Sequence, residues 1–255
     1  MPTLVEWYAA HGRHELPWRA TRDRWSVLVS EVMLHQTQVP RVVNAWPAFI
    51  RRYPTPEAMA ATSAGDVIRA WGRLGYPRRA RWLWEAAGVI ARDGWPDDLA
   101  ALPGVGVYTA AAIRAQADGA DVPAVEVNIR RVVERFEGRR LTDRAARDAS
   151  VRCGRPLRGR DRLLALMDVG ALLCRPRAPR CDECPFRRRC ATRGVLPDRR
   201  RSQAPFAGSF RQRRGVVLAA LRDGSQPVST LDHDALRSLV TDGLAVLSGD
   251  QAHLP

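Results

Sequence analysis

Residues 102–110 read Leu-Pro-Gly-Val-Gly-Val-Tyr-Thr-Ala, and this stretch decides how the rest of the chain is interpreted. The pattern predicts a helix, a tight glycine turn and the start of a second helix. Gly104 and Gly106 permit positive φ and leave backbone N–H groups uncovered. Together with the dipole at the start of the second helix, these groups would bind a phosphate without reading base sequence. A plain turn between two helices is the alternative for this stretch taken alone.

Outward from this turn, apolar residues recur at helical spacing, for example over 25–33, 82–90 and 163–167. Strand-like alternation is scarce, and turn signals at 53–56, 94–97 and 102–104 separate the helices. We therefore expect residues 1–190 to be mainly α-helical.

The end of the chain has a different composition. Residues 195–209 are expected to be a basic linker, and 210–255 a small unit with helices over 215–222 and 232–242. The order of elements in that unit resembles a winged helix. Because about 50 residues form only a marginal core, we expect it to pack on the main domain.

The formal net charge of +14 is unevenly distributed, and all 41 basic residues are arginine. Residues 175–214 hold 13 arginines and three acidic residues, whereas 215–255 carry a net charge of −3. The basic segment suggests a polyanionic partner such as nucleic acid, with a solvated surface as the alternative. Because lysine is absent, no side-chain amine is available for Schiff-base chemistry.

The sequence contains no stretch approaching the roughly 18 consecutive apolar residues of a membrane span. Its first residues lack the basic and apolar regions of a secretion signal. We therefore expect a cytoplasmic protein with no membrane partner.

Four of the five cysteines lie close together in the chain, with the spacing C-x6-C-x2-C-x5-C. In a chain expected to be intracellular, this spacing indicates a metal site rather than disulfides. Zinc sites usually combine two short pairs, whereas only the middle pair is close here. A [4Fe–4S] cluster fits better, and zinc is the alternative. The proposed ligands are Cys174, Cys181, Cys184 and Cys190.

Several motifs in this order resemble one family. The glycine turn at 102–110 is followed by the four-cysteine loop at 174–190, and positions 29–39 read Val-Ser-Glu-Val-Met-Leu-His-Gln-Thr-Gln-Val. Further motifs lie at 16–19, 71–76, 166–171 and 206–215. Together they resemble the helix-hairpin-helix DNA glycosylases with an iron–sulfur cluster, of the adenine DNA glycosylase (MutY-like) type. The resemblance is strong over about 3–190 and weak in the tail.

The resemblance implies a mainly α, two-lobed helix-hairpin-helix glycosylase fold. Residues 1–194 would form this domain, with a six-helix module over about 25–130 and a cluster lobe made of the N-terminal segment and 131–194. The linker 195–209 and a small winged-helix-like unit over 210–255 would follow. The arginine-rich segment would then lie on the DNA face around the cluster loop.

Glu31 lies in an otherwise apolar helical stretch, where burial would raise its pKa and keep a proton available near neutrality. A buried ion pair with an arginine is the alternative for such a residue. The resemblance implies that Glu31 protonates adenine N7 in a flipped nucleotide and then helps to activate water.

The second carboxylate departs from the family pattern. Glu126 stands where the family has Asp, and Val127 stands where it has Gly or Thr, whereas Asn128 is retained. The extra methylene of Glu would shift the carboxylate by about 1.5 Å, and a misplacement of that size can lower a rate by about 10²-fold. Glu126 therefore acts in a reshaped pocket, or the chain handles a different base. Asn128 is expected to orient water or a carboxylate.

Tyr108 occupies the hairpin position where strand-nicking relatives carry a catalytic lysine. Since the chain has no lysine, we expect a monofunctional glycosylase without lyase activity. The resemblance also assigns Gln36 and Thr37 to the base opposite the flipped one, and Leu74 and Tyr76 to a wedge in the base stack. Core packing is the alternative for Leu74 and Tyr76. His35 replaces the family Gln and would act as a pH-sensitive contact or a hydrogen-bonded spacer.

The expected function is excision of adenine opposite 8-oxoguanine or guanine by a monomer acting on double-stranded DNA that contains a mismatch or lesion. Excision of another base, such as thymine or uracil opposite guanine, is the enzymatic alternative. A non-catalytic lesion-binding protein is the alternative from another class. The segment 191–255 is too short for the long C-terminal domain that reads 8-oxoguanine in longer relatives.

Overall fold

The computed structural model describes residues 1–196 and 205–255, which form two compact units. The first unit contains Met1–Glu31 and Val105–Arg199, and the second contains Val32–Gly104 and Arg200–Pro255. Within the described residues, helices dominate and all strands fall within 226–253, so the expected mainly helical fold is confirmed.

The first unit begins with α1 (Leu4–His11), the short 3-10 turn η1 (Pro17–Arg19) and the first part of α2 (Arg24–Leu34). Thr3 and Glu6 form a reciprocal capping box at the start of α1. The carboxylate of Asp23 accepts a hydrogen bond from the backbone N–H of Ser26 at 2.7 Å and so caps the first turn of α2.

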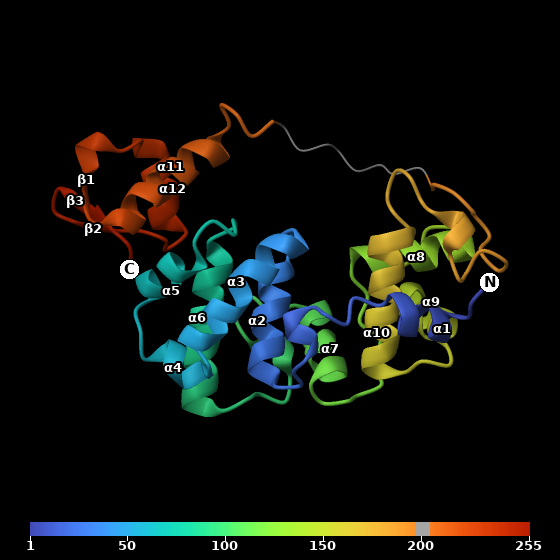
Figure 1. Ribbon diagram of the computed structural model, residues 1–255. Helices are drawn as coiled ribbons and strands as arrows, with labels where there is room; N and C mark the ends of the chain where they lie inside the picture. The colour runs from blue at the N-terminus through green and yellow to red at the C-terminus, as the bar shows by residue number, and fades with distance from the viewer. Residues whose placement is uncertain (197–204) are drawn as a thin grey trace. The chain divides into compact units, whose positions relative to one another are not determined.

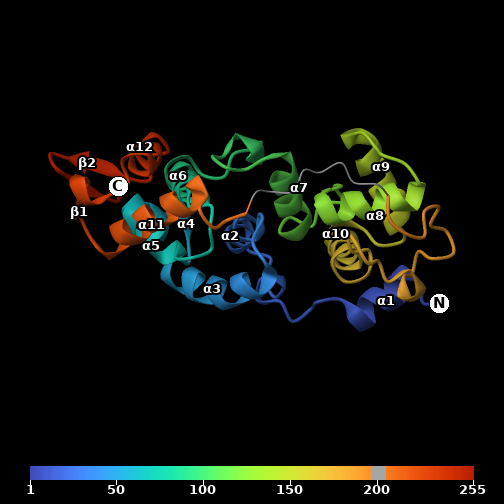
Figure 2. The same ribbon diagram turned by 90° about the horizontal axis from the view of Figure 1, so that it is seen from above.

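The rest of the first unit is a helical cluster (Figures 1 and 2). Its helices are α7 (Val107–Gln116), α8 (Val127–Glu137), α9 (Asp143–Gly154) and α10 (Gly159–Asp168), followed by the π-helical turn η3 (Val169–Leu173). α8, α9 and α10 pack against one another, and α1 lies against α10. At Gly170 a Cβ atom would lie 2.7 Å from the Cβ of Asn128, so glycine permits the close approach of η3 and α8.

The four-cysteine loop follows η3 and contains the 3-10 turn η4 (Cys181–Glu183). Arg135 of α8 anchors the loop, because Nη1 donates to the carbonyl of Arg175 at 2.7 Å and Nη2 to that of Pro176 at 2.8 Å. Two hydrogen bonds from Arg135 thus attach the start of the loop to α8.

The second unit contains α3 (Val39–Arg52), α4 (Pro56–Ala60), α5 (Ala64–Trp71), α6 (Arg78–Asp93) and η2 (Leu99–Ala101). α4 and α5 pack on α6. An edge-to-face aromatic contact joins α3 and α5, since the ring centroids of Phe49 and Trp71 lie 5.8 Å apart.

The C-terminal part of this unit contains α11 (Phe210–Asp223), β1 (Gln226–Pro227), η5 (Val228–Thr230), α12 (His233–Thr241), β2 (Val246–Ser248) and β3 (Gln251–His253). The strands form an antiparallel sheet in the order β1-β3-β2, with Leu247 opposite Ala252. The expected start of the first helix at residue 215 was wrong. Ser209 caps α11 by accepting from the N–H of Gln212, so that helix begins at Phe210.

This C-terminal part packs on α5 and α6. The N–H of Gly65 donates to the carbonyl of Pro255, and Arg81 Nη1 donates to the carbonyl of Asp242 at 2.9 Å. Of the expected linker 195–209, residues 197–204 lie outside the described residues. In the described part of the chain, no helix is long and apolar enough to cross a bilayer.

Candidate active site

The glycine turn joins η2 to α7 as expected. Gly104 has a φ of +74°, and a Cβ atom there would lie 2.8 Å from the Cβ of Trp82, so both the conformation and the space require glycine. Gly106 does not use the freedom that glycine has, because its backbone is extended with a φ of −94°. Gly106 caps α7 without a side-chain hydrogen bond, and Val107 is 71% exposed. The first N–H groups of α7 are therefore accessible to an anion.

Glu31 is buried on α2, with 4% of its surface exposed. Gln116, at the end of α7, donates from Nε2 to the Glu31 carboxylate at 2.8 Å. Burial raises the pKa of Glu31, and the nearby Glu126 carboxylate raises it further, while hydrogen bonds from Gln116 and Tyr108 and the charge of Arg19 lower it. The net effect is upward, which favours a carboxyl group that carries a proton to be donated.

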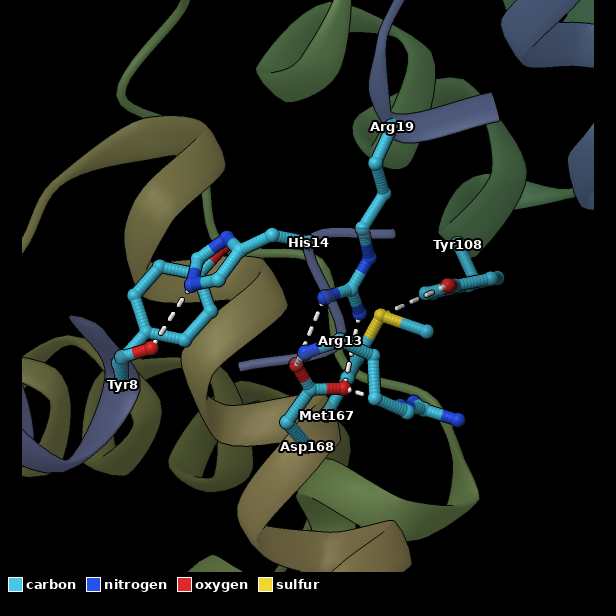
Figure 3. Close-up of polar contacts among 7 residues, drawn as sticks. All are labelled: Tyr8, Arg13, His14, Arg19, Tyr108, Met167 and Asp168. Atoms are coloured by element: carbon cyan, nitrogen blue, oxygen red, sulfur yellow. Dashed lines mark hydrogen bonds and ion pairs between the residues drawn. The ribbon is translucent and has the colours of Figure 1, made fainter. Parts of the chain in front are cut away.

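Tyr108 lies in the first turn of α7, and its hydroxyl interacts with the carboxyl group of Glu31, which lowers the pKa of Glu31 and raises that of Tyr108. The same hydroxyl points toward Met167 Sδ at 4.0 Å (Figure 3). Burial and the charges of Glu31 and Glu126 raise the pKa of Tyr108 well above its ordinary value. Tyr108 is therefore a neutral hydrogen-bonding partner of the carboxylates near neutral pH.

Glu126 is the N-cap of α8. Its Oε2 accepts from the backbone N–H of Asn128 at 2.7 Å and from Asn128 Nδ2 at 2.9 Å, and its Oε1 accepts from the N–H of Ile129 at 2.9 Å. Burial raises the pKa of Glu126, although these hydrogen bonds and Arg131 oppose the shift. The carboxylate is thus held in one orientation by the start of the helix that it caps.

Arg131 connects this cap to the cysteine loop. Its Nη2 donates to Asn128 Oδ1 at 2.6 Å and to the carbonyl of Gly170 at 2.7 Å, and its Nε donates to the carbonyl of Cys174. Asn128 therefore has its amide nitrogen on Glu126 and its amide oxygen on Arg131. The Asn128 side chain is therefore held by a hydrogen bond at its amide nitrogen and another at its amide oxygen.

Sequence reasoning missed the role of Asp168, which is fully buried at the end of α10. Arg19 donates from Nη1 to Oδ2 at 2.7 Å and from Nη2 to Oδ1 at 2.8 Å, while Arg13 donates from Nε and from its backbone N–H (Figure 3). Burial would raise the pKa of Asp168, but the hydrogen bonds and charges of Arg19 and Arg13 outweigh it and lower the pKa.

A signal for this network was present in the sequence. Asp168 interrupts the apolar run of residues 163–173, and an acidic residue in a buried helix needs a cationic partner. Arg19 supplies that partner and also lowers the pKa of Glu31 through its charge. The Nε of Arg19 is buried without a hydrogen-bond partner in the described structure.

The four predicted cysteine ligands line one pocket, together with residues of α8 and η3. Arg135 Nη1 lies 3.4 Å from the sulfur of Cys174, and the thiol of Cys190 donates to the carbonyl of Arg135 at 3.3 Å. Among the described residues, no three His, Cys, Asp or Glu side chains are gathered closely enough to hold a single metal ion. Cys153 is buried outside the group that lines this pocket.

The predicted DNA contacts of the second unit lie in two loops. His35, Gln36 and Thr37 follow α2, whereas Leu74 and Tyr76 lie between α5 and α6. Leu74 is buried, with 6% exposed, whereas Tyr76 is 47% exposed, so only Tyr76 presents an accessible side chain of the expected wedge pair. Burial and the charge of Arg79 lower the pKa of His35, which favours a neutral hydrogen-bonded spacer over a charged contact.

The structure thus gathers Glu31, Tyr108, Glu126 and Asn128 in the first unit, joined by the hydrogen bonds and charge effects above. The residues assigned to the opposite base and the wedge belong to the second unit.

Comparisons with known proteins identify the family of this chain. A family model described as "HhH-GPD superfamily base excision DNA repair protein" matches residues 29–152. The adenine DNA glycosylase of Mycobacterium tuberculosis (strain CDC 1551 / Oshkosh) is 43% identical over 277 aligned positions, covering 97% of this chain and 90% of that protein. The chain therefore belongs to the HhH-GPD superfamily of base excision DNA repair proteins.

Within the superfamily, two other relatives are informative. The thymine-DNA glycosylase of Aeropyrum pernix is 34% identical over 202 aligned positions, covering 73% of this chain and 91% of that protein. The solved structure titled "Structure of a thermostable thymine-DNA glycosylase" has a TM-score of 0.68 and 29% identity, covering 74% of this chain and 93% of that chain. The adenine DNA glycosylase of Mycobacterium tuberculosis matches nearly the whole chain, whereas the thymine-type relatives and the human adenine DNA glycosylase match about three quarters of it.

Proposed function

We propose that this protein is a monofunctional DNA glycosylase that hydrolyses the N-glycosidic bond of a flipped adenine opposite 8-oxoguanine or guanine. The single observation that carries the proposal is the buried Glu31, whose pKa is raised and whose carboxyl group lies against Tyr108 and near Glu126. The 43% identity to an adenine DNA glycosylase over nearly the whole chain supports adenine as the base.

The chemistry requires a proton on the leaving base and a negative charge near the developing sugar cation. Glu31 donates its proton to N7 of adenine, the bond between C1′ and N9 breaks, and the base leaves neutral. The Glu126 carboxylate stabilises the positive charge at C1′ and the ring oxygen. Water adds at C1′ and loses a proton to Glu31, which restores the starting state. In the hydrolysis of glycosidic bonds, two carboxyl groups often have different pKa values because their surroundings differ. One then acts as the acid while the other stays ionised.

Asn128 fixes the Glu126 carboxylate in this scheme, and Tyr108 holds Glu31 without supplying a nucleophile. A Schiff base with the sugar needs an amine, and the sequence contains no lysine. We therefore propose base release without strand nicking.

A second base specificity has its own support. Glu126 and Val127 replace the Asp and small residue of the family pattern, and a thymine-DNA glycosylase is among the relatives. Excision of thymine or uracil opposite guanine is therefore the alternative enzymatic function. The alternative from another class is a protein that binds lesions without catalysis.

We propose that Cys174, Cys181, Cys184 and Cys190 hold a [4Fe–4S] cluster. The support is that all four thiols line one pocket. Arg135 also lines this pocket and donates a hydrogen bond to the loop at the carbonyl of Arg175. Four thiolates suit such a cluster, and burial raises the pKa of Cys184 to about 12, so binding must displace the thiol proton. Cys174, Cys181, Cys184 and Cys190 would hold the cluster through their thiolates, and its binding would cross-link the loop.

We further propose double-stranded DNA as the partner of the hairpin and the arginine-rich segment, with the protein acting as a monomer at the nucleoid in the cytoplasm. Residues 1–194 are proposed as the glycosylase domain, 195–209 as a linker and 210–255 as a winged-helix-like unit. The support for the last assignment is the order α11, β1, η5, α12, β2, β3 with a three-stranded antiparallel sheet.

A panel of duplexes tests the function. Each duplex pairs adenine, thymine or uracil with guanine, 8-oxoguanine or cytosine, and heating in alkali after incubation cleaves the strand wherever a base was lost. Loss of adenine alone supports the proposal. Loss of another base supports the second specificity, and binding without loss of any base overturns glycosylase activity.

A further inference from the structure

Arg79, in the first turn of α6, is a buried cation whose partners are not carboxylates. Arg79 is 5% exposed. Nη1 donates to the carbonyls of Val32 at 2.7 Å, Met33 at 3.1 Å and His35. These carbonyls belong to the last turn of α2 and the residue just after it, where an α-helix leaves its acceptors unpaired.

The second terminal nitrogen of Arg79 contacts two loops. Nη2 donates to Thr37 Oγ1 at 2.9 Å and to the carbonyl of Gly75 at 3.0 Å. The guanidinium also lies 5.3 Å from the ring centroid of Tyr76 and 5.3 Å from that of Trp71. One planar group therefore joins loop 35–38, which follows α2, to loop 72–76, which precedes α6.

The two loops also contact each other directly. Thr37 Oγ1 donates to the carbonyl of Leu74 at 3.4 Å, and Trp71 Nε1 donates to the carbonyl of Gly75 at 3.0 Å. Each loop holds a non-glycine residue in the left-handed region, Gln36 at a φ of +56° and Tyr76 at +48°. Such conformations persist where the surroundings determine them, and they cluster at functional sites.

The chemistry of arginine suits this position. Burial lowers the pKa of Arg79 to about 10, so the group stays charged near neutral pH. The planar guanidinium group carries several N–H donors, so it can bind acceptors on two sides at once and can also lie against aromatic rings. The ammonium group of lysine is a single point charge and cannot do both. Among the residues that the structure describes, Arg79 makes no ion pair with a carboxylate, so its charge is satisfied by carbonyl dipoles and rings.

We propose that Arg79 is a positioning residue that fixes loops 35–38 and 72–76 as one element, so that the residues that read the opposite base and the residue that enters the base stack engage DNA together. The DNA part rests on the proposed glycosylase function. The positioning part concerns the free protein and can be measured without DNA.

Hydrogen exchange tests the positioning part. In Arg79→Gln, amides of residues 34–38 and 72–79 are expected to lose about tenfold or more of their protection, because the shared anchor is gone. Arg79→Lys, which keeps the charge, should fold and show an intermediate loss. Arg81→Gln is the matched control, since Arg81 also donates from α6 to a backbone carbonyl, and its hydrogen bonds in the described structure go to Glu85 and Asp242 and not to either loop. Unchanged protection of both loops in the Arg79 variants would overturn the proposal.

Single-turnover excision tests the DNA part. One duplex carries adenine opposite 8-oxoguanine, and a second carries adenine opposite an abasic site, where no base is read and no pair must be broken. Arg79→Gln should slow excision by about 10- to 100-fold on the first duplex and leave the second within a factor of about three of wild type. Equal slowing on both would overturn the positioning role. Because exchange is measured on the free protein, failure of the proposed function and failure of this inference remain distinguishable.

Discussion

The guanidinium of Arg19 meets the carboxylate of Asp168 through two parallel hydrogen bonds of 2.7 and 2.8 Å, and the carboxylate is fully buried. This contact ties η1 to the end of α10 (Figure 3). Arg13 adds a second cation to the same carboxylate. Because the charge of Arg19 also lowers the pKa of Glu31, the pair helps to set the charge balance of the candidate active site.

Asp168→Asn should be strongly destabilising near neutral pH. Removing one partner of a buried ion pair typically costs about 3–5 kcal/mol, because the remaining charge stays buried without compensation. The lowered pKa of Asp168 means that its contribution is present above the ordinary value of 3.8 and is lost as the pH falls through the folded-state pKa. Urea denaturation at pH 7 and pH 3 should show a large difference at pH 7 and a smaller one at pH 3. An unchanged midpoint at pH 7 would contradict this role.

Glu31→Gln should abolish base excision and preserve DNA binding. Glutamine keeps the size of the side chain and its contact with Gln116 but has no proton to donate to the base. Single-turnover rates and fluorescence anisotropy with the same duplex measure the two properties separately. Retained excision would remove Glu31 from its assignment as the acid.

The same substitution should stabilise the fold as the pH rises. Because the folded-state pKa of Glu31 is raised above 4.5, its contribution to stability is complete below that value and declines as the pH rises through the folded-state pKa. Glu31→Gln removes this dependence. Thermal denaturation should therefore give similar midpoints near pH 4 and a higher midpoint for the variant at pH 8. A lower midpoint at pH 8 would show that the carboxylate is compensated in the folded protein.

Glu126→Asp should keep the cap of α8 and lose activity. Aspartate is a good N-cap residue, so the melting temperature should change little. The shorter side chain withdraws the carboxylate by about 1.5 Å, which should slow excision by about 10²-fold if the pocket is built around glutamate. Single-turnover kinetics measure the excision rates of the variant and the wild type. Faster excision by the variant would show that the pocket is not adapted to glutamate at position 126.

The purified protein should be brown, absorb near 400 nm and contain iron and sulfide. Cys184→Ala should lose this absorbance, since it removes one of the four thiols that line the pocket. Cys153→Ala is the control, because Cys153 lies outside that group, and it should keep the colour. A colourless, zinc-containing protein after anaerobic purification would exclude the cluster.

Much of the site was predictable from the sequence because its signals are local. The glycine turn at 102–110, the spacing of the four cysteines and the lone carboxylate of Glu31 in an apolar helix each follow from residues close together in the chain. The start of α11 was missed because residues 211–214, which follow Phe210, are all polar and show no apolar period, although Ser209 is a residue type that caps helices. The hydrogen bonds that hold the Glu126 carboxylate at the start of α8 are seen only in the structure.

The sequence by itself determined the family, the helical class and the identity of the chemical groups, because motifs, hydrophobic period and residue type are properties of neighbouring residues. The tertiary structure alone decided which distant groups meet. Arg19 and Asp168 are 149 residues apart in the chain, and Arg79 binds carbonyls that precede it by 44 to 47 residues. The N–H groups of an arginine can donate hydrogen bonds to many different acceptors. The packing of the helices therefore determines which acceptors each arginine binds.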